Sequence, residues 1–133
     1  MARALSNRVG EKPVPSTFEY GDLFEQFLIL EFIKLNHYLE KRFRFSYFRN
    51  ENSYEVDLVI EKPNGEILLV EIKSQISIDL EEVRKLSHFR RLFPKAKLYF
   101  LSQDENARLE SGDVYCLPWF EGLKQIFELP TTL

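Results

Sequence analysis

Residues 54–74 read YEVDLVIEKPNGEILLVEIKS, and this stretch decides the fold. Two apolar runs of strand length flank the tripeptide Pro63-Asn64-Gly65. Proline suits the first central position of a type I turn, and glycine accepts the positive φ that follows, so the tripeptide predicts a three-residue hairpin loop. The sequence therefore predicts two antiparallel strands over residues 54–61 and 66–74.

A loop of three residues also predicts which side chains meet across the hairpin. In that register the numbers of paired residues sum to 128, which places Asp57 opposite Glu71 and Glu55 opposite Lys73. Because side chains alternate along a strand, Glu71 and Lys73 project to the same side, and the apolar side chains between them cover the other side. The register thus gathers two carboxylates and one ammonium group on one face.

These gathered charges point to metal-dependent chemistry. Directly opposed carboxylates with Cβ atoms ~5 Å apart repel by roughly 3 kcal/mol at an effective dielectric of ~20, and a divalent cation between Asp57 and Glu71 would offset that repulsion. Mg²⁺ suits two carboxylates plus waters, and Lys73 could orient a water nucleophile or steady developing phosphate charge. The alternative is that both acids are solvated on an open sheet face and screened by Lys73. Both acids interrupt apolar runs, where an uncompensated carboxylate is costly, and this favours the metal.

Gln75 is an accessory candidate for the same site. It lies two residues beyond Lys73, on the same face if the strand continues, where its amide can hydrogen-bond a phosphate or a metal-bound water. The alternative is a polar side chain that only ends the strand.

The remaining sequence predicts helices and strands in a definite order. Residues 19–39 are rich in Phe, Leu and Ile over helix length, with apolar groups on most sides, which predicts a buried helix. We expect a strand at 42–49, a helix at 79–93 capped by Asp79, strands at 97–101 and 113–117 separated by a polar loop, and a helix at 118–127. The order is α-β-β-β-α-β-β-α, an α/β sandwich around a central mixed sheet. Residues 1–18 are expected to form a leader or linker, and residues 19–133 a single domain.

Composition excludes several classes of protein. With 133 residues, of which 44% are hydrophobic and 29% charged, the chain suits one globular domain. The longest apolar runs are far shorter than the roughly 20 residues of a membrane helix, and residues 1–10 lack a secretory signal, so we expect a cytoplasmic location without membrane contact. The single Cys116 excludes an internal disulfide. Neither common phosphate loop is present, so the chain is not itself an ATPase.

The charge balance bears on nucleic-acid binding. A net charge of −3 argues against non-specific coating of nucleic acid, because that affinity comes from cations that neutralise phosphates. Residues 84–97 nevertheless contain six Lys or Arg and no acid. This stretch is either a phosphate-tracking surface or the basic end of a helix, which the helix dipole favours.

Glu55-Val56-Asp57 followed by Glu71-Ile72-Lys73 resembles the PD-(D/E)XK signature of the restriction-endonuclease-like nuclease superfamily, with Asp57, Glu71 and Lys73 on its three motif positions. In that superfamily a glutamate on the helix before the core strands often joins the metal site, and Glu25 fits this place. The resemblance implies a nuclease-like fold and hydrolysis of nucleic acid, expected to be DNA. It also implies Mg²⁺ as cofactor, with Mn²⁺ as a substitute, held by Glu25, Asp57 and Glu71. The proline of the superfamily's name is absent, and Glu55 stands just before Val56-Asp57.

A narrower resemblance suggests an alternative function. The sequence is similar to the uncharacterised domain that closes many prokaryotic AAA-type ATPases, on the stretches 19–21, 24–27, 48–49, 55–57 and 70–74. This similarity implies a catalytically inactive binding or regulatory module with an AAA-type ATPase as its partner. A third hypothesis is a homodimer that uses its aromatic surface to join two sites across a duplex.

Overall fold

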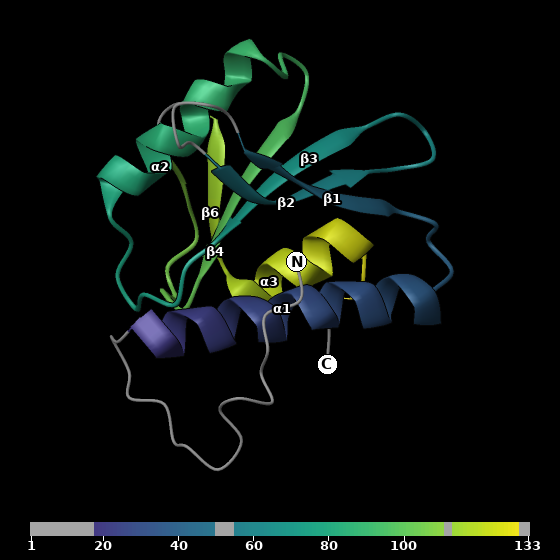
Figure 1. Cartoon of the computed structure of the whole chain (residues 1–133), viewed down its shortest axis with the longest axis horizontal. Coiled ribbons are helices and arrows are strands. Elements are labelled where there is room, and N and C mark those ends of the chain that lie inside the picture. The colour runs from purple at the N-terminus through teal and green to yellow at the C-terminus, as the bar shows by residue number, and fades with distance from the viewer. Residues whose placement is uncertain (1–17, 50–54, 111–112, 131–133) are drawn as a thin grey trace.

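The computed structural model describes residues 18–49, 55–110 and 113–130, so the leader predicted over residues 1–18 lies almost wholly outside the described residues. The elements are α1 (Phe18–Tyr38), β1 (Arg44–Arg49), β2 (Glu55–Glu61), β3 (Ile67–Ile72), α2 (Leu80–Ser87), the 3₁₀ helix η2 (His88–Arg91), β4 (Lys97–Ser102), β5 (Arg108–Glu110), β6 (Val114–Pro118) and α3 (Trp119–Phe127). Six strands form one sheet in the order β1-β2-β3-β4-β6-β5 (Figure 1). The pairs β3–β4 and β4–β6 are parallel and the other pairs are antiparallel, which confirms the predicted mixed sheet.

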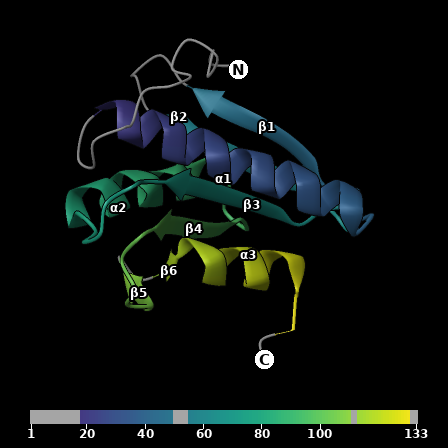
Figure 2. The same cartoon turned by 90° about the horizontal axis from the view of Figure 1, so that it is seen from below.

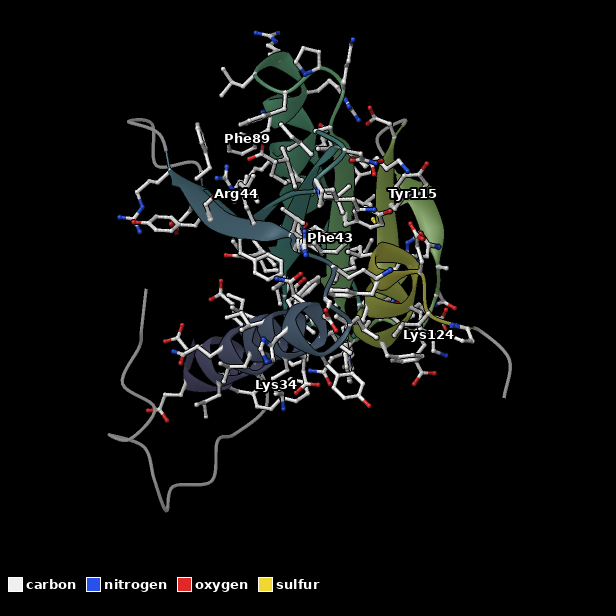
Figure 3. The ribbon with its side chains drawn as sticks, turned by 90° about the vertical axis from the view of Figure 1, so that its right-hand side faces the viewer. Lys34, Phe43, Arg44, Phe89, Tyr115 and Lys124 are labelled. Atoms are coloured by element: carbon white, nitrogen blue, oxygen red, sulfur yellow. The ribbon has the colours of Figure 1, made fainter. Side chains whose placement is uncertain are left out.

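The sheet has a layer of helices on each face. Helices α1 and α3 lie next to each other on one face, and α2 covers the other (Figures 1 and 2). Alternate residues of β4 pack into the two layers in turn. Tyr99 and Leu101 belong to the core cluster under α1 and α3. Leu98 and Phe100 belong to the cluster under α2. Seen edge-on, Phe89 lies in the α2 layer (Figure 3). Burial on both faces explains why these central strands are almost continuously apolar.

Helix α1 is less buried than its sequence predicts. Phe24, Leu28, Ile29 and Phe32 pack into the core. The prediction of burial on most sides is wrong for the outer side, where Phe27, Leu30 and Ile33 are 44–48% exposed. Within the described ranges no helix is long and apolar enough to cross a membrane.

The hairpin register is confirmed. The ladder between β2 and β3 pairs Leu58 with Val70 and continues to Glu61 with Ile67, so the paired numbers sum to 128. In the loop, Gly65 has the positive φ of 92° and its N–H donates to the Lys62 carbonyl at 2.9 Å. The turn chemistry of Pro63-Asn64-Gly65 therefore places the acids correctly along their strands.

Two predicted boundaries need correction, and one strand is not predicted. Arg42 has φ of 62°, which is incompatible with the extended backbone, so β1 begins at Arg44 rather than at residue 42. The α-helix predicted over 79–93 ends at Ser87 and continues as the 3₁₀ helix η2. Its start is predicted correctly, because the Asp79 side chain caps it by accepting a hydrogen bond from the Glu81 N–H at 3.0 Å. The predicted polar loop contains the short edge strand β5.

Helix α3 approaches β4 closely at Gly122. A Cβ added there would overlap both Cδ atoms of the buried Leu101. Although alanine is the better helix former, we expect Gly122→Ala to lower the free energy of unfolding by about 1–3 kcal/mol in urea denaturation. Gly21→Ala is the matched control, because its Cβ would lie 3.7 Å from the Ser74 Oγ, an ordinary contact. A Gly122→Ala variant as stable as Gly21→Ala would contradict this packing.

Candidate active site

A β-bulge interrupts β2 at Asp57. Residues 46–48 of β1 pair with residues 56–59 of β2, so β2 carries one extra residue. As a result Val56 packs in the core cluster under α2, whereas Leu58 packs under α1 and α3, although residues two apart in a strand normally share a face. Bulges bend a strand and re-aim its side chains, and Asp57 lies between these two residues.

Where β2 and β3 part, hydrogen bonds from backbone N–H groups to the Asp57 and Glu71 carboxylates take the place of backbone pairing. The last backbone pair between β2 and β3 is Leu58 with Val70. Beyond it, the Asp57 Oδ2 accepts a hydrogen bond from the Ile72 N–H at 2.8 Å, and the Glu71 Oε1 accepts one from the Asp57 N–H at 3.3 Å. The structure therefore places Asp57 next to Glu71, as the register predicts, through bonds between side chain and backbone.

The predicted pairing of Glu55 with Lys73 is wrong. Glu55 turns to β1, where its Oε2 accepts hydrogen bonds from the Arg49 Nε at 3.2 Å and Nη2 at 3.1 Å. The Lys73 N–H donates to the Leu101 carbonyl of β4 at 2.9 Å. Because the bulge ends the regular β2–β3 ladder at Leu58, the register cannot be extended to these two residues.

Glu25 comes from α1 and joins the two acids. Its carboxyl is hydrogen-bonded to that of Asp57, although the two residues lie far apart in the sequence. Both line a cleft of about 550 Å³ between α1 and the ends of the strands, together with Lys73 and Gln75. Glu71 takes part through its contacts with Asp57 and Lys73. Four of the five candidate residues thus line one cleft, and Glu71 contacts two of them.

Burial raises the pKa values of all three acids. The pKa of Glu25 rises to about 9, through burial first and then through its hydrogen bond to Asp57 and the repulsion from that group. The pKa of Asp57 rises to about 7 because burial and the Glu71 charge outweigh the hydrogen bonds from Glu25 and the Ile72 N–H. The pKa of Glu71 rises to about 6, again mainly through burial, which Lys73 opposes. At neutral pH, Glu25 therefore keeps its proton and donates a hydrogen bond to the Asp57 carboxylate.

Lys73 supplies the positive charge of the site. Its Nζ lies 3.7 Å from the Glu71 Oε2, with the two side chains 33% and 15% exposed. Burial alone would lower the pKa of Lys73, but attraction to Glu71, then to Glu82 and Asp57, outweighs burial and raises it. Lys73 is accordingly an ammonium ion at neutral pH.

Gln103 supports the site and is missed by the sequence analysis. Its Nε2 donates to the Ser74 carbonyl at 2.9 Å and to the Tyr20 hydroxyl at 3.0 Å, and its N–H donates to the Gln75 carbonyl at 2.9 Å. It therefore ties the end of β4 to the chain after β3 and to the start of α1. The signal available in the sequence is a polar residue directly after the buried run 98–102.

Three residues on the β1 side of the cleft are also missed. Tyr47, Arg49 and Glu55 line the same cleft as Glu25 and Asp57. The sequence contains Arg49 and Tyr47 in an alternating strand, but the side of the sheet they take depends on the bulge. Their position could therefore be found only from the structure.

The donors fit a hard divalent cation, although they are not already arranged as a ligand cage. Within the described residues, no three His, Cys, Asp or Glu side chains are grouped so as to hold a metal ion. The carboxylates are nevertheless crowded enough to hold a proton at neutral pH, and a cation relieves the same repulsion. Oxygen donors of this kind suit Mg²⁺ and Mn²⁺.

The basic stretch 84–97 is largely neutralised within the fold. Arg84 pairs with Glu81 and Lys85 with Glu82, while Arg90 pairs with Asp113 and Lys97 with Glu66, at 2.7–3.6 Å. These pairs favour the interpretation of a basic helix end over that of a phosphate-tracking surface.

Comparisons with known proteins give a family and one structural neighbour. A family described as a domain of unknown function (DUF4143) matches residues 20–120. No curated protein matches the chain. A chain from the refined half-complex of the tetradecameric assembly of Thermococcus gammatolerans McrB AAA+ hexamers with bound McrC is similar, with 17% identity and a TM-score of 0.47. The similarity covers 74% of this chain and 27% of that one.

Proposed function

The chain belongs to the DUF4143 family, and we propose that it is a phosphodiesterase of restriction-endonuclease-like fold that hydrolyses nucleic acid with Mg²⁺. One observation carries the proposal: Glu25 from α1, Asp57 from the bulge of β2 and Lys73 after β3 line one cleft. Glu71 of β3 contacts both Asp57 and Lys73 beside it. Carboxylates can hold a divalent ion that polarises a phosphate, and a neighbouring ammonium group can stabilise the developing charge.

Each residue has a distinct role in the proposed reaction. Asp57 and Glu71 would hold Mg²⁺, or Mn²⁺ in its place, and Glu25 would support it directly or through water after losing its proton. The bound ion supplies Lewis-acid polarisation of the phosphate and a more acidic water. The Lys73 ammonium, fixed by Glu71, would orient the hydrolytic water or stabilise negative charge on the scissile phosphate. Gln75, exposed at the mouth of the cleft, would hydrogen-bond a phosphate oxygen.

The proposal is tested by digestion of labelled DNA and RNA, each as a single strand and as a duplex. We expect cleavage with Mg²⁺ or Mn²⁺ and none in EDTA, because the carboxylates alone repel a phosphate. Protein carrying Asp57→Ala serves as the control for contaminating nucleases. Cleavage that survives in EDTA or in the Asp57→Ala protein would contradict the proposal.

The second candidate is an inactive binding module that works beside an AAA-type ATPase. The observation in its favour is that both acids already serve the fold, since Asp57 and Glu71 accept hydrogen bonds from backbone N–H groups across the strand ends. Calorimetric titration with Mn²⁺ separates the two candidates. Metal binding without cleavage of any of the four substrates would favour the module.

A further inference from the structure

The cleft has a second wall that the proposed chemistry leaves unused. Tyr47 and Arg49 on β1 line it opposite α1, and the Tyr47 side chain is 61% exposed. The Arg49 guanidinium donates from two nitrogens to one Glu55 oxygen, at 3.1 and 3.2 Å, which fixes its plane while 66% of the side chain stays exposed. An exposed aromatic ring and an oriented guanidinium therefore stand beside the acids.

The fold holds this wall rigidly. Strand β1 is an edge strand, but aromatic residues on both sides of Tyr47 anchor it to the two helical layers. Phe45 packs edge-on against Phe32 of α1 at 6.3 Å between ring centroids, and Phe48 packs edge-on against Phe89 at 5.5 Å. The strand is thus held in place on both sides of Tyr47, and binding there requires little ordering of the strand.

The net negative charge of the protein favours binding of nucleic acid by base stacking over binding by attraction to phosphates. With a net charge of −3 and with several acids around the cleft, attraction to phosphates contributes little affinity. Stacking of bases on aromatic rings does not depend on net charge, and it requires a base whose faces are uncovered. A base paired within a duplex has both faces covered by its neighbours.

We infer that Tyr47 and Arg49 form a subsite for an unpaired nucleotide next to the scissile phosphate, so that the substrate class is single-stranded nucleic acid. The Tyr47 ring stacks on the base and the Arg49 guanidinium contacts the adjoining phosphate. The inference rests on the proposed function for the position of the scissile phosphate, because the same cleft holds Asp57 and Lys73.

Binding assays test the subsite independently of cleavage. Fluorescence anisotropy with Ca²⁺ in place of Mg²⁺ compares a labelled single strand, the blunt duplex of the same sequence, and the single strand with an abasic tract. Tyr47→Ala is expected to weaken binding of the intact single strand about tenfold and to leave binding of the abasic strand unchanged, because only stacking is lost. Arg49→Gln is expected to weaken binding of both strands and to reduce the salt slope by about one.

Matched variants control for unfolding and for general surface effects. Tyr47→Phe keeps the ring and is expected to bind within about twofold of the wild type. Tyr38→Ala removes an 82% exposed tyrosine from the far end of α1 and is expected to bind like the wild type. Tyr47→Ala protein that binds the intact strand as tightly as the wild type, or a duplex that binds as tightly as the single strand, would overturn the inference and leave the proposed reaction standing. Tyr47-dependent binding without cleavage in Mg²⁺ would uphold the subsite and overturn the reaction.

Discussion

Replacing Lys73 by methionine is expected to slow Mg²⁺-dependent cleavage about a thousand-fold while Mn²⁺ binding is retained. Removing one group that stabilises transition-state charge typically costs a factor of 10²–10³, and methionine fills a similar volume without charge. Lys73 contacts Glu71 but provides no oxygen for a cation, so its loss affects the reaction more than the metal. Single-turnover rates and calorimetric titration with Mn²⁺ measure the two effects separately.

Two further variants serve as controls for the Lys73→Met result. Asp57→Asn is expected to lose both metal binding and cleavage, while its amide oxygen can still accept the hydrogen bond from the Ile72 N–H. Lys85→Met removes an exposed lysine of α2 and is expected to cleave like the wild type. A Lys73→Met rate within tenfold of the wild-type rate would contradict the role of Lys73.

The second large effect concerns stability in metal-free buffer. Raising the pH from 5 to 9 is expected to lower the free energy of unfolding by several kcal/mol. The pKa values of Glu71, Asp57 and Glu25 lie at about 6, 7 and 9 in the folded protein, above their ordinary values of 4.5, 3.8 and 4.5. The folded state therefore holds protons that the unfolded state has released, and folding becomes less favourable as the pH rises through these values.

Urea denaturation across this pH range, with and without Mg²⁺, measures the effect. The lowered pKa values of Asp104 and Glu66 change stability only near and below pH 4.5, so they do not mask the decline. If Mg²⁺ binds the folded cluster as proposed, it is expected to restore stability, most strongly at high pH. Glu25→Gln is expected to flatten the curve, because its amide stays neutral at every pH. Stability that rises between pH 5 and pH 9 would show that the acids do not form this cluster.

The sequence predicts the hairpin because its determinants are local. Pro63-Asn64-Gly65 sets the loop, the loop sets the register, and the register places Asp57 beside Glu71. Asp79 is likewise recognised as a cap, since the residues it serves follow directly in the chain.

Features that depend on contacts between distant parts of the chain could not be predicted from the sequence. The bulge at Asp57 arises from pairing with β1, and no local pattern distinguishes it from regular alternation. The Asn36 side chain accepts a hydrogen bond from the Phe43 N–H at 2.9 Å and donates one to the Phe43 carbonyl at 3.0 Å, and so guides the chain into β1. β5 has three residues and gains its strand geometry from β6 alone.

The hydrogen bonds from the Asp57 and Glu71 side chains to backbone N–H groups have a consequence for how relatives are sorted. Because both acids bond backbone N–H groups where the strands part, a relative without the proposed activity would still lose structure by losing either one. Their presence in a relative is therefore evidence of shared architecture. The lysine two positions after the second acid, whose ammonium contacts Glu71 rather than the backbone, is the more informative marker of the proposed activity.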